Sequence, residues 1–141
     1  MSTEINFFTE KIDFSLDNES NIKSWIKKSI EDENCISGDL NFIFTSDQNL
    51  LQINKDFLNH DFFTDIITFD YRESDSISGD IFLSIDRIKE NAKGLSNSFN
   101  NELHRVLIHG VLHIIGYNDK SAEEELLMRS KEDFYLSLRT F

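Results

Sequence analysis

The sequence reads LHRVLIHGVLHIIGYND from Leu103 to Asp119, a stretch that combines a dense apolar run with three possible metal ligands. Because apolar residues recur around most of its circumference, we expect a helix over residues 102–115 that is buried at the centre of the domain. His109 and His113 are four residues apart and therefore share one face of this helix, with Cβ atoms about 5–6 Å apart. Two imidazoles placed in this way can bind one small cation.

Gly116 follows the second histidine by three residues, and glycine readily adopts the left-handed conformation that ends a helix. The chain can then turn back and bring Asp119 towards the same ion. Two nitrogens and one carboxylate oxygen suit zinc and leave a fourth position for water, so we predict one catalytic zinc ion per chain, held by His109, His113 and Asp119. The same donors also accommodate nickel, cobalt or iron. The alternative is that each histidine forms a separate hydrogen bond in the core.

The rest of the chain alternates between strand and helix patterns. We expect strands at residues 5–8, 40–45, 65–71 and 78–85, with a hairpin between the last two. Further helices are expected over residues 21–33, after an Asp47 cap, from an Asp86 cap to Gly94, and from a Ser121-Ala122-Glu123-Glu124 capping box to about Leu138, while residues 97–100 read as loop. This order predicts the α+β class: a single domain with a small mixed β-sheet of about four strands, covered by helices around the central buried one.

The composition is consistent with one domain over residues 1–141. No apolar run reaches the roughly 20 residues of a membrane helix, and the N-terminus has no signal-peptide pattern. Cys35 is the single cysteine, so an internal disulfide cannot form. We therefore expect a cytoplasmic protein without a membrane partner. The net charge of −12 disfavours a non-specific nucleic-acid binder, because such proteins are usually basic.

The spacing HxxxHxxGxxD is similar to the extended zinc motif of some metalloproteases. Those enzymes carry a glutamate directly after the first histidine, which acts as the general base. Here that position is Gly110, which has no side chain and can transfer no proton. Peptide hydrolysis by that mechanism is therefore disfavoured.

The two remaining histidines are not expected to bind the ion. His104 precedes His109 by five residues, about 140° around the helix, and we expect it on the surface or behind the metal ligands. His60 lies in a polar stretch, where a solvated side chain is expected. The alternative for His60 is that it lines a cleft, since loops often carry functional residues.

Several separated blocks of the chain resemble the YbeY family, metal-dependent endoribonucleases of bacterial ribosomal RNA maturation. The stretch from His109 to Tyr117 matches the family signature His-Gly-x-Leu-His-x-x-Gly-Tyr. Residues 52–57 and 64–69 are similar to the family's Leu-Asn and Thr-Asp-Val-Leu-Ser-Phe segments, Gly79-Asp80-Ile81 is similar to its Gly-Asp-Ile strand, and Met128 falls in the helix after the motif. The likeness covers about Leu50 to Phe134.

Two positions depart from the family pattern. The motif commonly ends in Tyr-Asp-His, and Asp119 occupies the place of that third histidine. A carboxylate still binds zinc, although it lowers the charge of the site. Many members also carry an arginine, thought to act at the phosphate, where this chain has Leu58. Arg72 and Arg105 are the two candidates to supply that charge instead.

The resemblance implies a zinc-dependent endoribonuclease that acts on single-stranded ribosomal RNA in ribosome assembly, with a metal-activated water. The general acid and base are not apparent from the sequence. Exposed aromatics such as Phe62, Phe63 or Tyr117 would stack on bases, although we favour core packing for Phe63 and Phe69. Two alternatives remain open: a metal-dependent hydrolase of another substrate, and a zinc-stabilised, non-catalytic protein that docks to basic ribosomal proteins through its acidic surface.

Overall fold

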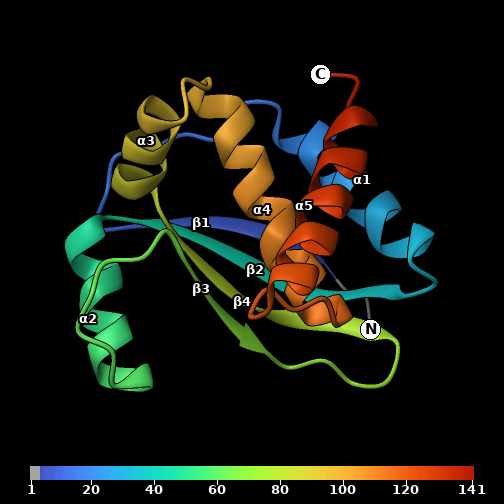
Figure 1. Cartoon of the computed structure of the whole chain (residues 1–141), viewed down its shortest axis with the longest axis horizontal. Coiled ribbons are helices and arrows are strands. Elements are labelled where there is room, and N and C mark those ends of the chain that lie inside the picture. Colours follow the sequence, from blue (N-terminus) through green and yellow to red (C-terminus); the bar gives the residue numbers. More distant parts are fainter. Residues whose placement is uncertain (1–3) are drawn as a thin grey trace.

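Four strands form one mixed β-sheet in the computed structural model, which describes residues 4–141. The strand order is β1-β2-β4-β3 (Figure 1). The strands are β1 (Ile5–Glu10), β2 (Ile36–Thr45), β3 (Ile66–Asp70) and β4 (Ser76–Ser84). β1, β2 and β4 run parallel, and β3 pairs antiparallel with β4. The expected mixed sheet of about four strands, with a hairpin between the last two, is confirmed.

Five helices in the described part of the chain, residues 4–141, accompany the sheet, and together they form one α+β domain, as predicted. They are α1 (Glu19–Asp32), α2 (Asp47–Leu58), α3 (Ile85–Gly94), α4 (Phe99–Ile115) and α5 (Ala122–Ser137). α4 crosses the sheet against β3 and β4, with α1 and α5 beside it, whereas α2 lies apart from them near β3 and α3 (Figure 1). Within residues 4–141, no helix combines the length and the apolar character needed to cross a membrane.

Two glycines allow α4 to approach the sheet closely. A Cβ atom on Gly110 would lie 2.9 Å from Ile66 Cδ1 and 3.2 Å from Ile81 Cγ2. On the sheet side, a Cβ on Gly79 would lie 2.9 Å from Ile114 Cδ1 of α4. The helix therefore packs tightly against the strands at Gly110, which lies between His109 and His113 in the sequence. The prediction that this helix is the buried centre of the domain is confirmed.

Two predicted helix caps are wrong by one or two residues. Ser46, rather than Asp47, caps α2, and Ser84, rather than Asp86, caps α3. In each case the serine hydroxyl accepts a hydrogen bond from the N–H of the residue three positions later, which is the usual geometry of an N-cap. The carboxylate of Asp86 instead accepts the N–H of Asp47 at 2.9 Å, so it joins the starts of the two helices.

The start of α4 also differs from the prediction. Residues 97–100 were expected as loop, but the helix begins at Phe99 and is capped by Ser98. The capping box at the start of α5 is confirmed, because the Ser121 hydroxyl accepts the Glu124 N–H while the Glu124 side chain accepts the Ser121 N–H.

Candidate metal centre

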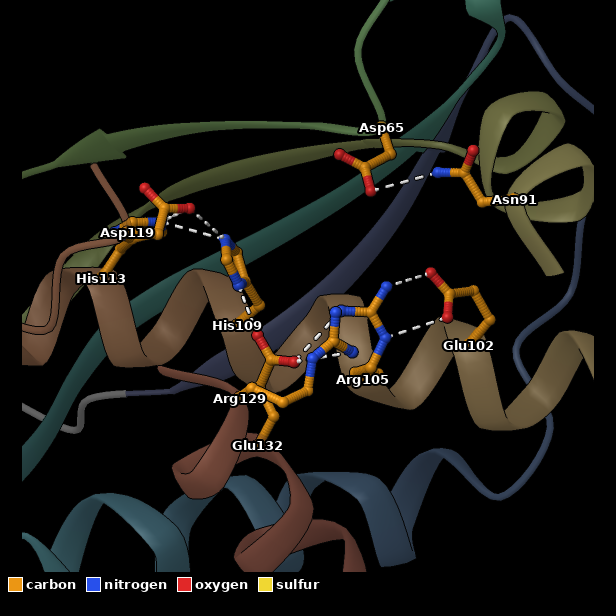
Figure 2. A network of polar contacts seen from close by, with 9 residues as sticks. All are labelled: Asp65, Asn91, Glu102, Arg105, His109, His113, Asp119, Arg129 and Glu132. Atoms are coloured by element: carbon orange, nitrogen blue, oxygen red, sulfur yellow. Dashed lines mark hydrogen bonds and ion pairs between the residues drawn. The ribbon is translucent and has the colours of Figure 1, made fainter. Parts of the chain in front are cut away.

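The end of α4 brings the three predicted ligands together. Gly116 has φ of +130°, and the N–H groups of Gly116 and Tyr117 both donate to the Leu112 carbonyl at 3.0 Å. This turn reverses the chain, so that Asp119 faces the two histidines (Figure 2). Asp119 Oδ2 lies 3.4 Å from His109 Nε2 and 3.3 Å from His113 Nε2, and the two Nε2 atoms are 2.9 Å apart.

These distances fit one small ion with tetrahedral ligands. For bonds of about 2.0–2.1 Å, neighbouring tetrahedral ligand atoms are separated by about 3.3 Å. Both nitrogen–oxygen separations have this value, and the nitrogen–nitrogen separation is slightly shorter. The side chains of His109, His113 and Asp119 are 18%, 28% and 40% exposed, so solvent can reach the centre. The residues present could therefore hold zinc with one position open.

Glu132 of α5 orients the first histidine. Its Oε2 lies 2.6 Å from His109 Nδ1, and its side chain is only 2% exposed. Burial opposes ionisation of Glu132, but the hydrogen bond with His109 and the charge of Arg105 hold its pKa below the ordinary value. An ionised carboxylate accepts the Nδ1–H of His109, which leaves the Nε2 lone pair directed at the site. The geometry is that of a carboxylate behind a metal-binding histidine.

Glu132 was not singled out in the sequence, although a signal for it exists. The residues of α5 that are buried are Met128, Glu132 and Tyr135, which follow one another at helical spacing. An acidic residue on the apolar stripe of a helix must find a partner inside the protein, because a buried unpaired charge is costly. That partner, His109, lies on another helix and could not be identified from spacing along the chain.

Arg105 continues the network behind the histidine (Figure 2). Its Nη1 donates to Glu132 Oε1 at 3.1 Å and its Nε donates to Glu102 Oε1 at 2.9 Å. Burial disfavours the charge, but hydrogen bonds with Glu102 and Glu132 raise the pKa of Arg105. The guanidinium therefore holds Glu132, the carboxylate that contacts His109, in place. It is bound on two sides by buried carboxylates and is not placed to replace the arginine of the family.

Arg72 is occupied as well. Its Nη1 donates to the carbonyl oxygens of Ile114 and Ile115 at 3.3 and 2.5 Å, so it satisfies the C-terminus of α4. Leu58, which the resemblance predicts to stand at the place of the family arginine, lines an open pocket of about 380 Å³ together with His109, His113 and Asp119. The position is thus beside the metal centre, but the side chain there carries no charge.

The same pocket contains two residues from the segment between α2 and β3. His60 lines it, which agrees with the alternative of a cleft residue, and its side chain is exposed. Asp65 lines it from the sheet side, where Asn91 Nδ2 donates to its Oδ2 at 3.4 Å (Figure 2). Burial raises the pKa of Asp65. The sequence marked Asp65 as part of the block similar to Thr-Asp-Val-Leu-Ser-Phe and as an expected strand residue, but neither signal pointed to a place in this pocket.

The prediction of a surface position for His104 is wrong. His104 is 6% exposed and packs between the rings of Trp25 and Phe141, at centroid distances of 6.0 and 5.4 Å. Its Nδ1 accepts a hydrogen bond from Arg139 at 2.6 Å. The prediction failed because α4 is covered on several sides, so a residue that points away from the ion is still inside the domain.

The structure also shows where the aromatic side chains considered for base stacking or core packing lie. Phe63 was expected in the core but is 43% exposed, with the Arg87 guanidinium 5.0 Å above its ring. Phe69 was also expected in the core but is only half-buried, with its ring against those of Phe57 and Phe82. The hydroxyl of Tyr117 donates to Glu33 at 2.5 Å, so this ring is fixed on the far side of the turn.

Comparisons with known proteins match nearly the whole chain. A profile of the family described as Endoribonuclease YbeY matches residues 4–139. The chain is 49% identical to Endoribonuclease YbeY of Cytophaga hutchinsonii over 138 residues, which cover 97% of this chain and 96% of that protein. It is 50% identical to the protein of the same name from Flavobacterium psychrophilum over 131 residues, or 93% and 94% of the two chains. The solution structure of TM1509 from Thermotoga maritima is 28% identical, with a TM-score of 0.68 over 95% of this chain and 87% of that one.

Proposed function

Because the chain belongs to the YbeY family of endoribonucleases, we propose that it cleaves single-stranded ribosomal RNA by hydrolysis at a zinc centre held by His109, His113 and Asp119. The observation that carries this proposal is the meeting of these three side chains at tetrahedral separations beside an open pocket. When bound, zinc would supply a Lewis acid and would bring the pKa of a water molecule at the site down to about 7.

The residues of the chain prepare the site for this chemistry. Glu132 holds the Nδ1 proton of His109, so that Nε2 is free to bind. His113 follows one turn later on the same rigid helix, and Asp119 supplies the single negative charge among the three ligands. Leu58 and Ile66 contribute apolar side chains to the lining of the pocket. A phosphodiester of a flexible single strand can enter such an open pocket, whereas a stiff duplex cannot bend into it.

The experiment combines metal analysis with RNA cleavage. We expect about one zinc ion per purified chain, and we expect His113→Ala to lose most of the metal and at least about 100-fold in cleavage rate on single-stranded RNA. His104→Gln, a change of another histidine of α4, serves as the matched control and should keep both. Equal cleavage by His113→Ala and the unaltered protein would refute the proposal and indicate a contaminating nuclease.

A second candidate function is a non-catalytic one, favoured by the environment of Leu58. The position of the family arginine carries no charge, and Arg72 and Arg105 are both bound elsewhere. A zinc-stabilised domain with net charge −12 could instead dock to basic ribosomal proteins. In that case chelation should melt the domain and abolish partner binding, with no RNA turnover in any assay. Peptide hydrolysis has no such support, because the place of the protease glutamate is closed at Gly110 by Ile66 and Ile81.

A further inference from the structure

An exposed pair of stacked rings stands at the edge of the pocket that contains the candidate metal centre. The rings of His60 and Phe62 have centroids 5.1 Å apart and planes inclined by 21°. Both residues line the pocket with His109, His113 and Asp119. Phe62 is 54% exposed, so its ring is open to solvent at the pocket. What distinguishes it from the other exposed phenylalanines is that it stacks on a second ring and lines the pocket of the candidate metal centre.

The backbone around the pair is built to hold it in place. Asn54 is 1% exposed, and its Nδ2 donates to the carbonyl of Phe62 at 2.9 Å. The carbonyl of Asn54 in turn accepts the N–H of His60 at 3.1 Å and that of Asn59, which ends α2 with φ of +57°. One buried side chain and one carbonyl thus fix both ends of the segment. Rings that are ordered before binding lose less entropy when a ligand arrives.

The wall that carries the two rings offers no cation to a phosphate. Among the described residues, no lysine or arginine lines this pocket, and Lys55 is paired with Asp61 at 3.4 Å. A phosphate would therefore be bound by the metal centre and not by this wall. A flat aromatic ligand would be accepted, because stacking depends on a π-face and not on charge. In an RNA strand that group is the base.

We propose that His60 and Phe62 form a stacking platform for one unpaired base of the RNA, next to the bond that is cleaved. This inference rests on the proposed function and names the part of the substrate that is held at this wall. Since every base has a π-face, the platform selects unpaired bases rather than one sequence, and larger purines gain most. Affinity then comes from the base while the metal centre acts on the phosphate.

The test measures binding and turnover separately, with the zinc-loaded full chain. The probe is a 3′-fluorescein oligo(rA) 12-mer, and the comparison probe is the same strand with its central bases replaced by abasic residues. Kd is measured by fluorescence anisotropy at low temperature, with the strand shown to be intact on a denaturing gel. KM and kcat are measured from cleavage of the same oligonucleotide.

We expect Phe62→Ala to raise Kd and KM by about 5- to 100-fold while kcat changes less than about 2-fold. His60→Ala should act in the same direction, and Phe62→Trp should keep the affinity. The abasic strand should bind the unaltered protein weakly and should not be weakened further by Phe62→Ala. Tyr71→Ala is the matched control, since Tyr71 is 58% exposed but does not line the pocket.

The outcomes separate this inference from the proposed function. If the protein cleaves RNA and Phe62→Ala leaves Kd and KM unchanged, or Tyr71→Ala weakens binding equally, the platform is refuted and the nuclease stands. If Phe62→Ala weakens binding of the oligonucleotide but the unaltered protein cleaves nothing, the platform stands and the nuclease is refuted. No binding of oligo(rA) by the unaltered protein refutes the platform as well.

Discussion

Gly110 shows how one residue can serve the fold and restrict the chemistry at once. It lies next to His109, where a protease of similar spacing would need its general base. The structural reason for glycine is the contact with the sheet, because a Cβ atom there would lie 2.9 Å from Ile66 Cδ1. The close packing sets the depth of α4 and therefore the height of both histidines above the strands. The missing side chain is thus a requirement of packing.

Glu132 provides a prediction at the same scale. We expect Glu132→Gln to lower zinc affinity by about 10- to 100-fold, because a neutral amide is a weaker acceptor for the Nδ1–H of His109. Competition with a chromogenic chelator measures the affinity directly. Glu123→Gln, a change of an exposed glutamate in the first turn of the same helix, is the control and should have no effect. Unchanged zinc affinity in Glu132→Gln would show that this carboxylate only stabilises the packing of α5.

At the scale of elements, the metal centre depends on how α4 ends. His109 and His113 lie on the helix, but Asp119 reaches them only because the chain reverses after Gly116. Arg72 fastens this end by donating to the carbonyl oxygens of Ile114 and Ile115. The turn is therefore stabilised by a residue of the connection between β3 and β4 as well as by its own backbone hydrogen bonds. A change at the turn should affect stability and metal binding together.

We expect Gly116→Ala to reduce the free energy of unfolding by about 1–2 kcal/mol, because φ of +130° is unfavourable for a residue with a Cβ atom. Zinc affinity should fall as well, since Asp119 follows this turn. Urea unfolding and chelator competition measure the two effects. Gly94→Ala at the end of α3 is the control, because a Cβ atom there has no neighbour within 4 Å. Similar stability of the two variants would contradict the role given to the turn.

At the scale of the whole molecule, burial of His104 couples stability to pH. Burial, with the nearby charge of Arg139, lowers its pKa from 6.5 to about 4. Below pH 6.5 the unfolded chain takes up a proton that the folded chain does not. The free energy of unfolding should therefore decrease as the pH falls from 6.5 towards 4, whereas above pH 6.5 this histidine makes no difference.

We expect His104 to lower the free energy of unfolding by about 2 kcal/mol at pH 4.5, relative to its value above pH 6.5. The measurement compares urea unfolding of the unaltered protein and His104→Gln from pH 7.5 to 4.5 in the presence of a chelator. Glutamine can still accept from Arg139 but does not titrate, so the stability of the variant relative to the unaltered protein should improve towards low pH. Parallel pH profiles would mean that the pKa of His104 is the same in the folded and the unfolded chain, which contradicts the prediction.

The local part of this protein could be read from its sequence. The spacing of His109 and His113, the turn at Gly116 and the capping box at Ser121 depend on backbone dihedral angles and on contacts three or four residues apart. For the same reason, the strands and helices were located to within a few residues. Local signals compete at the start of α3, where Ser84 and Asp86 are both possible N-caps. Ser84 is the cap, because the carboxylate of Asp86 accepts the N–H of Asp47 in a tertiary contact.

The remaining features were decided only when the elements packed. The sequence alone determined that two imidazoles and a carboxylate could meet, because a helix and a turn bring them together within eleven residues. It did not reveal that Glu132 stands behind His109, that His104 is buried, or that His60 and Phe62 stack beside the centre. Each of these features depends on how separate helices and strands are placed relative to one another. Burial of apolar surface determines that placement, and it does not require any fixed number of residues between the side chains that meet.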